Sequence, residues 1–157
     1  MKQRILDINP QAKVEAHVEF YTEELAGKYI NNDINYVIDA VDTVTAKISL
    51  IEECTKRNIK IISCMGTGNK LDPIRLEVSD ISKTSVCPLA KVVRQELRKR
   101  NIEHVKVVYS KEEPIKHFEE LNKEDTQRKI IPASVSFVPS VAGLIVAGEV
   151  VKDLIKD

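Results

Sequence analysis

The sequence predicts an α/β fold in which parallel strands are connected by crossover helices. Two short apolar runs, at 34–39 and 59–64, are rich in β-branched residues and are typical of buried strands. Between them, apolar residues recur at helical spacing after Thr43, a residue type that favours the N-cap position. A strand–helix–strand order of this kind implies parallel pairing through a right-handed crossover.

The residues before this unit add two helices and another strand to the prediction. A helix is expected over 1–8 because its apolar residues share one face, and Pro10 ends it. It has no N-cap residue and no acidic first turn, so the chain looks as if it starts inside a helix. Apolar and polar residues alternate over 14–20, which predicts a half-buried strand. A short helix over 22–30 and a turn at 31–33 complete this region.

The residues after the second apolar run predict a loop, two more strands and a helix. The loop covers 65–73 and contains two glycines. Alternation of apolar and polar residues then predicts a strand over 74–79, and a second strand is expected over 105–109. The helix between them covers 88–100, with Pro88 in its first turn, where proline is tolerated.

The last part of the chain is predicted to hold a long connection and an apolar helix. The segment 110–134 is charge-dense and contains two prolines, and a connection this long is typical of functional or mobile loops. We predict a mobile loop there and a short strand at 135–137. The final helix, over 140–156, is apolar on nearly all sides, which favours central burial or a subunit interface. The 157 residues are expected to form a single domain.

Composition excludes several classes of protein. The formal net charge is zero, so no whole-molecule field draws the chain to nucleic acid or membrane, and such binding would need a local patch. Three widely spaced cysteines form no zinc-binding pattern and fit a reduced, cytoplasmic protein. The sequence shows no signal peptide and no apolar stretch long enough to span a bilayer.

The most informative chemistry follows the first apolar run. Asp39 ends the predicted strand and Asp42 precedes the next helix. Ligands bind at the carboxyl ends of strands in open α/β sheets, and an Asp there can hold Mg²⁺ or orient a nucleotide. The alternative is structural, since Asp42 would also suit the positive end of the following helix.

A phosphate-binding loop does not accompany these acids. The run 66–68 (Gly-Thr-Gly) follows a predicted strand, but it lacks a third glycine and the residues after it do not start a helix. We therefore interpret this run as a plain loop.

A basic face on the predicted helix over 88–100 is a candidate nucleic-acid surface. Spacings of three and four residues place several cations on one side, and two more extend the patch: Lys91, Arg94, Arg98, Lys99 and Arg100. Such a patch could contact a phosphate backbone. A solvated face whose last-turn cations suit the helix dipole would explain it equally well.

Several runs together resemble a known family. The run 37–47 (Val-Ile-Asp-Ala-Val-Asp-Thr-Val-Thr-Ala-Lys) resembles the Asp-x-x-Asp signature of the ThiF/MoeB/HesA superfamily, the adenylating enzymes related to ubiquitin-activating enzymes. The runs 8–10, 80–90, 93–100 and 137–143 are similar to the branch of tRNA threonylcarbamoyladenosine dehydratases. The resemblance covers essentially the whole chain and implies a partial Rossmann-like, ThiF-type fold.

The resemblance also implies an activity and its residues. These enzymes use ATP and Mg²⁺ to adenylate the carboxylate of threonylcarbamoyladenosine in tRNA, and ring closure then releases AMP. Asp42 matches the family aspartate that contacts the metal and the phosphates, and Asp39 lies beside it. Lys47 falls at a basic position of the family, and Phe20 and Tyr21 fall near the adenine pocket. The expected ligands are ATP and Mg²⁺, without zinc.

The resemblance further implies partners and a missing part. tRNA would contact the basic helix face, and a homodimer is expected. The glycine-rich loop and the phosphate-gripping residues of the family precede the point where this sequence begins, so we expect a C-terminal portion that is inactive alone. Two alternatives remain: activation of a ubiquitin-like sulfur-carrier protein, with a carrier or cysteine desulfurase system protein as partner, or a non-catalytic dimerising module.

Overall fold

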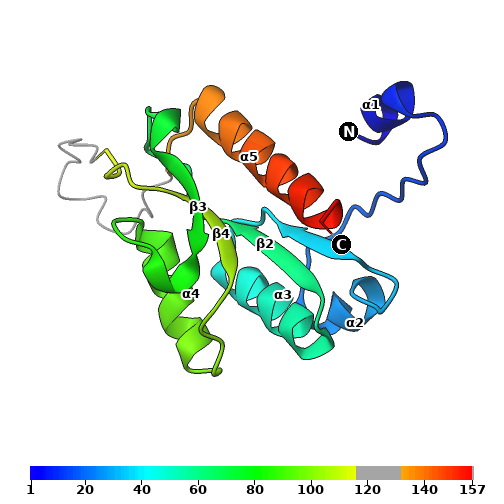
Figure 1. The fold of residues 1–157 in the computed structure, drawn as a ribbon, viewed down its shortest axis with the longest axis horizontal. Coiled ribbons are helices and arrows are strands. Elements are labelled where there is room, and N and C mark those ends of the chain that lie inside the picture. Colours follow the sequence, from blue (N-terminus) through cyan, green and yellow to red (C-terminus); the bar gives the residue numbers. More distant parts are fainter. Residues whose placement is uncertain (116–131, 157) are drawn as a thin grey trace, which may run out of the picture.

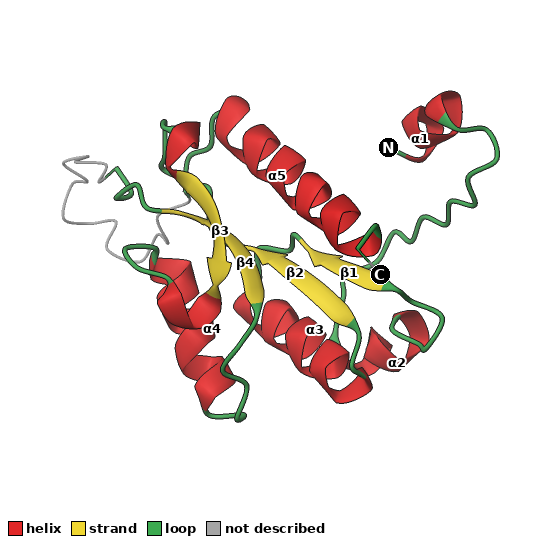
Figure 2. Ribbon diagram, in the orientation of Figure 1, coloured by secondary structure: helices red, strands yellow, loops and turns green. Residues whose placement is uncertain are grey.

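A four-stranded sheet lies between two layers of helices (Figures 1 and 2). The computed structural model describes residues 1–115 and 132–156. The strand order is β1-β2-β4-β3; β1, β2 and β4 are parallel, and β3 pairs antiparallel with β4. Their bounds are β1 Tyr36–Asp39, β2 Lys60–Cys64, β3 Leu76–Asp80 and β4 Lys106–Ser110. The predicted α/β class with parallel strands is confirmed.

Helix α3 (Val44–Arg57) is the crossover between β1 and β2. Its residues Ile48, Ile51 and Cys54 are buried, as their helical spacing predicts. The helix ends at Arg57, and the next residue, Asn58, has a φ of 55°, the left-handed conformation common after a helix.

Helix α4 (Pro88–Arg98) covers the same face of the sheet as α3 (Figure 1). Pro88 occupies its first turn, and Val93 and Leu97 have no exposed surface. Two short 3-10 turns flank β3: η2 (Pro73–Arg75) before it and η3 (Ile81–Lys83) after it. The strand expected over 74–79 therefore begins two residues later than predicted.

Helix α5 (Phe137–Leu154) covers the opposite face of the sheet (Figure 1). It packs Val138, Ala142 and Val146 against the sheet, while Leu144 and Val151 stay 73% and 56% exposed on its outer side. The short strand predicted at 135–137 was wrong, because the helix already begins at Phe137. Two apolar residues at alternate positions, Val135 and Phe137, are too short a pattern to distinguish a strand from the start of a helix. None of the described helices is long and apolar enough to cross a bilayer.

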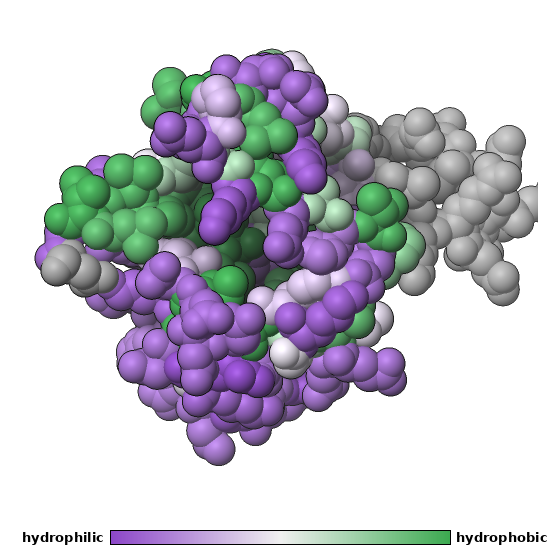
Figure 3. Space-filling view, turned by 90° about the vertical axis from the view of Figure 1, so that its right-hand side faces the viewer, coloured by the Kyte–Doolittle hydropathy of each residue, from purple (hydrophilic) through white to green (hydrophobic). Residues whose placement is uncertain are grey.

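The N-terminal helix stands away from the sheet (Figure 1). Helix α1 (Lys2–Ile8) has no buried residue, and a long extended segment leads from it to η1 (Glu23–Leu25) and α2 (Ala26–Tyr29) (Figure 1). The face on the right-hand side of Figure 1 has a hollow, with hydrophobic residues at its floor and hydrophilic residues around it (Figure 3).

The half-buried strand predicted over 14–20 was wrong. These residues pair with no described strand, and Val18 and Phe20 are 103% and 93% exposed. Alternation supplies a face to bury, but a strand also needs a neighbour for its backbone hydrogen bonds. The predicted mobile loop over 110–134 is described only at its two ends, and 116–131 lie outside the described residues.

Candidate functional site at the carboxyl end of the parallel strands

Asp39, the last residue of β1, is completely buried. Its Oδ2 accepts hydrogen bonds from Lys47 Nζ at 2.9 Å and from Ser63 Oγ at 2.5 Å. Its Oδ1 accepts from the backbone N–H of Val41 at 3.1 Å. Ser63 lies opposite Asp39 in the register of β1 and β2, so pairing of the strands brings these two side chains together.

Lys47 comes from the first turns of α3 and is also completely buried. Its ion pair with Asp39 joins the end of β1 to the start of the crossover helix. Both charges are balanced, as buried charges must be. Because three donors already occupy the carboxylate, Asp39 offers a metal no free oxygen unless Lys47 is released.

Asp42 has the opposite character. It lies three residues beyond the end of β1, immediately before the N-cap residue Thr43, and it is exposed. Its Oδ1 accepts one hydrogen bond, from Thr43 Oγ1 at 3.3 Å. An exposed carboxylate with free oxygens fits a hard cation such as Mg²⁺. The described residues alone contain no group of three His, Cys, Asp or Glu side chains that could hold a metal.

Phe20 and Tyr21 have different surroundings although they are adjacent. Phe20 is exposed, whereas Tyr21 packs against a cluster that contains Ile30, Leu50 and Cys54. The Tyr21 hydroxyl is shielded from solvent and makes no hydrogen bond within the described part of the chain. Burial raises the pKa of this phenol. Only Tyr21 is therefore held in a defined position.

The loop after β2 contains a buried charge that the sequence pattern did not indicate. Lys70 is 3% exposed, and its Nζ donates to the backbone carbonyl of Gly66 at 3.2 Å. Lysines in loops are exposed by default, so no sequence signal marks this one as buried. The loop is followed by η2 and not by an α-helix, as expected for a run that is not a phosphate loop.

The basic residues of α4 do not form one uniform patch. Arg94 reaches back to the loop after β3, where its guanidinium donates to the backbone carbonyl of Thr84 at 2.9 Å and to its hydroxyl at 2.5 Å. Lys99 and Arg100, just beyond the end of α4, pair with Glu96 of that helix at 2.5 and 3.1 Å. Arg100 also pairs with Glu52 of α3 at 3.4 Å. These three cations therefore contact groups of the chain itself.

Lys91 and Arg98 remain as exposed cations without an ion pair to any described residue. They are seven residues apart on the helix and so lie on one face. Of the five cations predicted to contact a phosphate backbone, these two are the ones without an ion pair in the described part of the chain.

A mostly parallel α/β sheet with an exposed acid beyond one strand end is the arrangement in which open α/β proteins bind ligands, at the carboxyl edge of the sheet. Comparison with known proteins makes this class specific. The ThiF family model matches residues 1–157, and the chain belongs to the ThiF family.

Two curated relatives of this chain have the same name. The chain is 50% identical over 165 residues to the tRNA threonylcarbamoyladenosine dehydratase of Bacillus subtilis, an alignment that covers all of this chain and 65% of that protein. It is 36% identical over 98 residues to the Escherichia coli dehydratase, covering 62% of this chain and 37% of that protein. The chain therefore spans less than two thirds of these curated relatives.

Solved structures agree with the sequence comparison. A structure described as TcdA (CsdL) matches with a TM-score of 0.84 at 26% identity, covering 99% of this chain and 63% of that one. The E. coli dehydratase in complex with ATP matches with a TM-score of 0.82 at 25% identity, covering 99% of this chain and 62% of that one. The predicted family and ThiF-type fold are confirmed.

Proposed function

We propose that this chain forms part of an ATP-dependent tRNA threonylcarbamoyladenosine dehydratase. The observation that carries the proposal is the 50% identity to the B. subtilis dehydratase across the whole of this chain. The solved E. coli dehydratase with ATP bound, which has the same fold, supports ATP as the co-substrate. An ATP site also needs a glycine-rich phosphate loop, which these 157 residues do not contain.

The proposed reaction activates a carboxylate and then closes a ring. A carboxylate oxygen of threonylcarbamoyladenosine attacks the α-phosphate of ATP, and pyrophosphate leaves. The carbamoyl group of the same side chain then attacks the activated carbonyl and gives up a proton, which closes the ring and releases AMP. AMP is a far better leaving group than hydroxide, and this is the chemical reason why the reaction consumes ATP.

Asp42 is the proposed magnesium ligand on this chain, because its carboxylate is exposed and accepts a single hydrogen bond, from the hydroxyl of Thr43. Bound Mg²⁺ would neutralise phosphate charge as it builds up during the transfer. Asp39 and Lys47 would act on Asp42 indirectly. Their buried pair fixes the turn between β1 and α3, and Asp42 lies within that turn.

tRNA is the proposed macromolecular substrate, and a second copy of the chain is the proposed partner. Lys91 and Arg98 are the free cations of α4 that would contact the phosphate backbone. The outer side of α5, with Leu144 and Val151 exposed, is the apolar face proposed for dimerisation.

The activity test joins this chain to the part of the B. subtilis relative that it does not match. The joined protein is given ATP, Mg²⁺ and tRNA carrying threonylcarbamoyladenosine, and mass spectrometry of the digested tRNA measures the cyclic product. We expect product formation, and we expect Asp42→Ala to lower kcat/KM by at least about 100-fold. Asp33→Ala, a change of an exposed acid in the turn before β1, is the matched control and should be silent.

Two results would contradict the proposal. One is absence of cyclic product from a joined protein that folds and binds ATP. The other is a measurable ATP affinity of the isolated chain that Asp42→Ala abolishes, because a complete ATP site would then exist without the expected phosphate loop.

A further inference from the structure

Two buried lysines lie near the carboxyl end of the sheet, and among the described residues a counter-charge is found for only one of them. Lys47 is paired with Asp39. Lys70 is almost as deeply buried, and its one hydrogen bond is to the neutral carbonyl of Gly66. No carboxylate of the described residues forms an ion pair with Lys70. One of the three N–H donors of its ammonium is therefore used.

This arrangement is costly unless an anion completes it. A buried ammonium without a counter-charge destabilises the folded state, even after the protein has relaxed around it. The other buried lysine, Lys47, has an aspartate of the chain as its counter-charge. An anion supplied from outside the chain would satisfy the two free donors of Lys70.

The start of helix α4 provides a second positive feature at the same loop. Gly66 packs against the first turn of α4, since a Cβ placed on it would lie 3.7 Å from Leu89 Cβ. The N-cap residue Cys87 makes no side-chain cap, and the first turn carries no acid. The positive end of this helix is thus left uncompensated beside the loop that Lys70 closes.

The position of this loop suits a substrate group. It follows β2, whose end lies next to the end of β1, where Asp39 and Asp42 are located. Residues 66–68 are partly exposed, so an anion can approach the loop from solvent. Ligands of open α/β sheets bind at this edge.

We propose that Lys70, the backbone of residues 66–68 and the first turn of α4 form a subsite for one oxyanion, and that this oxyanion is the substrate carboxylate to be activated. The carboxylate assignment rests on the proposed function; the anion site does not. A phosphate group could supply the same oxyanion chemistry, and the experiment below separates the two sources.

The test is a pair of NMR titrations on the chain itself at constant ionic strength. One probe is inorganic phosphate, and the other is the free nucleoside N6-threonylcarbamoyladenosine. We expect both to shift the backbone amides of 66–70 and of Leu89 and Ala90, saturating with a Kd of about 1–10 mM. Lys70→Met should weaken both by at least about 10-fold, since it removes the charge and keeps the length of the side chain.

The matched control is Lys83→Met, which removes an exposed lysine from η3, the turn that precedes α4, and should leave both affinities unchanged. Circular dichroism verifies the fold of each variant, and Lys70→Gln replaces Lys70→Met if the latter does not fold. Affinities that are equal in wild type and Lys70 variant would overturn the anion site. Lys70-dependent binding of phosphate but not of the nucleoside would overturn the carboxylate assignment. Failure of the cyclisation assay would change neither titration, so the two proposals fail separately.

Discussion

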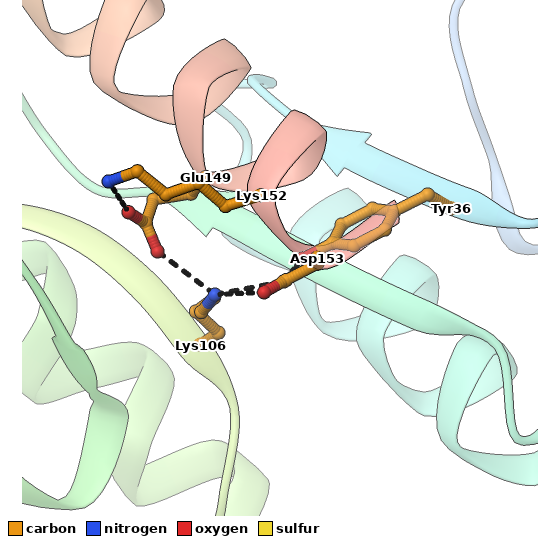
Figure 4. A network of polar contacts seen from close by, with 5 residues as sticks. All are labelled: Tyr36, Lys106, Glu149, Lys152 and Asp153. Carbon is orange, nitrogen blue, oxygen red and sulfur yellow. Dashed lines mark hydrogen bonds and ion pairs between the residues drawn. The ribbon is translucent and has the colours of Figure 1, made fainter. Parts of the chain in front are cut away.

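Two lysine-centred networks attach helices to the sheet, one at each end of its parallel strands, and they are built differently. At the carboxyl end, Lys47 and Asp39 are both completely buried. At the amino end, Lys106 on β4 is 32% exposed and donates to Glu149 at 3.0 Å and to Asp153 at 2.8 Å, both on α5 (Figure 4).

The second network is redundant as well as exposed. The Tyr36 hydroxyl also donates to Asp153, at 2.7 Å, and Lys152 pairs with Glu149 at 2.9 Å (Figure 4). Each acid therefore keeps one partner when Lys106 is lost, whereas Asp39 loses its counter-charge when Lys47 is lost. Burial and redundancy therefore decide how much each ion pair contributes to stability, and the number of its contacts does not.

Replacing Lys47 tests the buried network and should have the largest effect. Lys47→Met leaves Asp39 charged and unpaired in the interior, and we expect a loss of about 3–5 kcal/mol in the free energy of unfolding. Urea denaturation measures it. The double variant Asp39→Asn with Lys47→Met should lose less than the sum of the single changes. A loss below about 1 kcal/mol for Lys47→Met would show that the pair is open to water.

Replacing Lys106 tests the exposed network with the same chemical change. Lys106→Met should cost about 1 kcal/mol or less, because solvent screens the network and its acids keep other partners. The difference from wild type should shrink in 1 M NaCl (about 3 Å screening length). A loss equal to that of Lys47→Met, independent of salt, would contradict the distinction between the two ends.

Acid titration distinguishes the two networks further. Lys106, followed by Tyr36, lowers the pKa of Asp153, and Lys152, followed by Lys106, lowers that of Glu149. The folded-state pKa values of Asp153 and Glu149 lie below their ordinary values of 3.8 and 4.5. The stabilisation by these two carboxylates is therefore complete above the ordinary pKa values, and it is lost as the pH falls through the lowered pKa values of the folded state. Lys106→Met should flatten the decline of stability below about pH 4.5, as measured by thermal unfolding. If Lys106→Met left the decline of stability at low pH unchanged, this network would be excluded as the cause of that decline.

Asp42 should show the smallest effect on stability. It is exposed and accepts a single hydrogen bond, so Asp42→Ala should change the free energy of unfolding by no more than about 0.5 kcal/mol. Asp39→Ala, three residues earlier, should be strongly destabilising, because it leaves Lys47 buried and unpaired. Equal losses for the two aspartates would mean that Asp42 has a structural role as a cap.

Much of the fold follows from local pattern. Helix α3, strands β1, β2 and β4 and the proline-started helix α4 all lie within a few residues of their predicted positions. Each combines a run of regular period with a local start or stop signal, and both features act between neighbours in sequence. The alternation over 14–20 has the period but no partner strand among the described residues, and there the prediction failed.

The amino-acid sequence by itself determined the α/β class, the strand–helix–strand unit and the placement of Asp39 and Asp42 after a strand. Tertiary structure decided that Asp39 is paired with a lysine whereas Asp42 is exposed, and that Arg94 turns inward. It also decided that Lys70 is buried with no counter-charge among residues 1–115 and 132–156. The physical reason is that period and capping depend on adjacent residues. Burial and charge pairing depend on groups brought together from separate elements, such as Ser63 beside Asp39 or Leu89 beside Gly66.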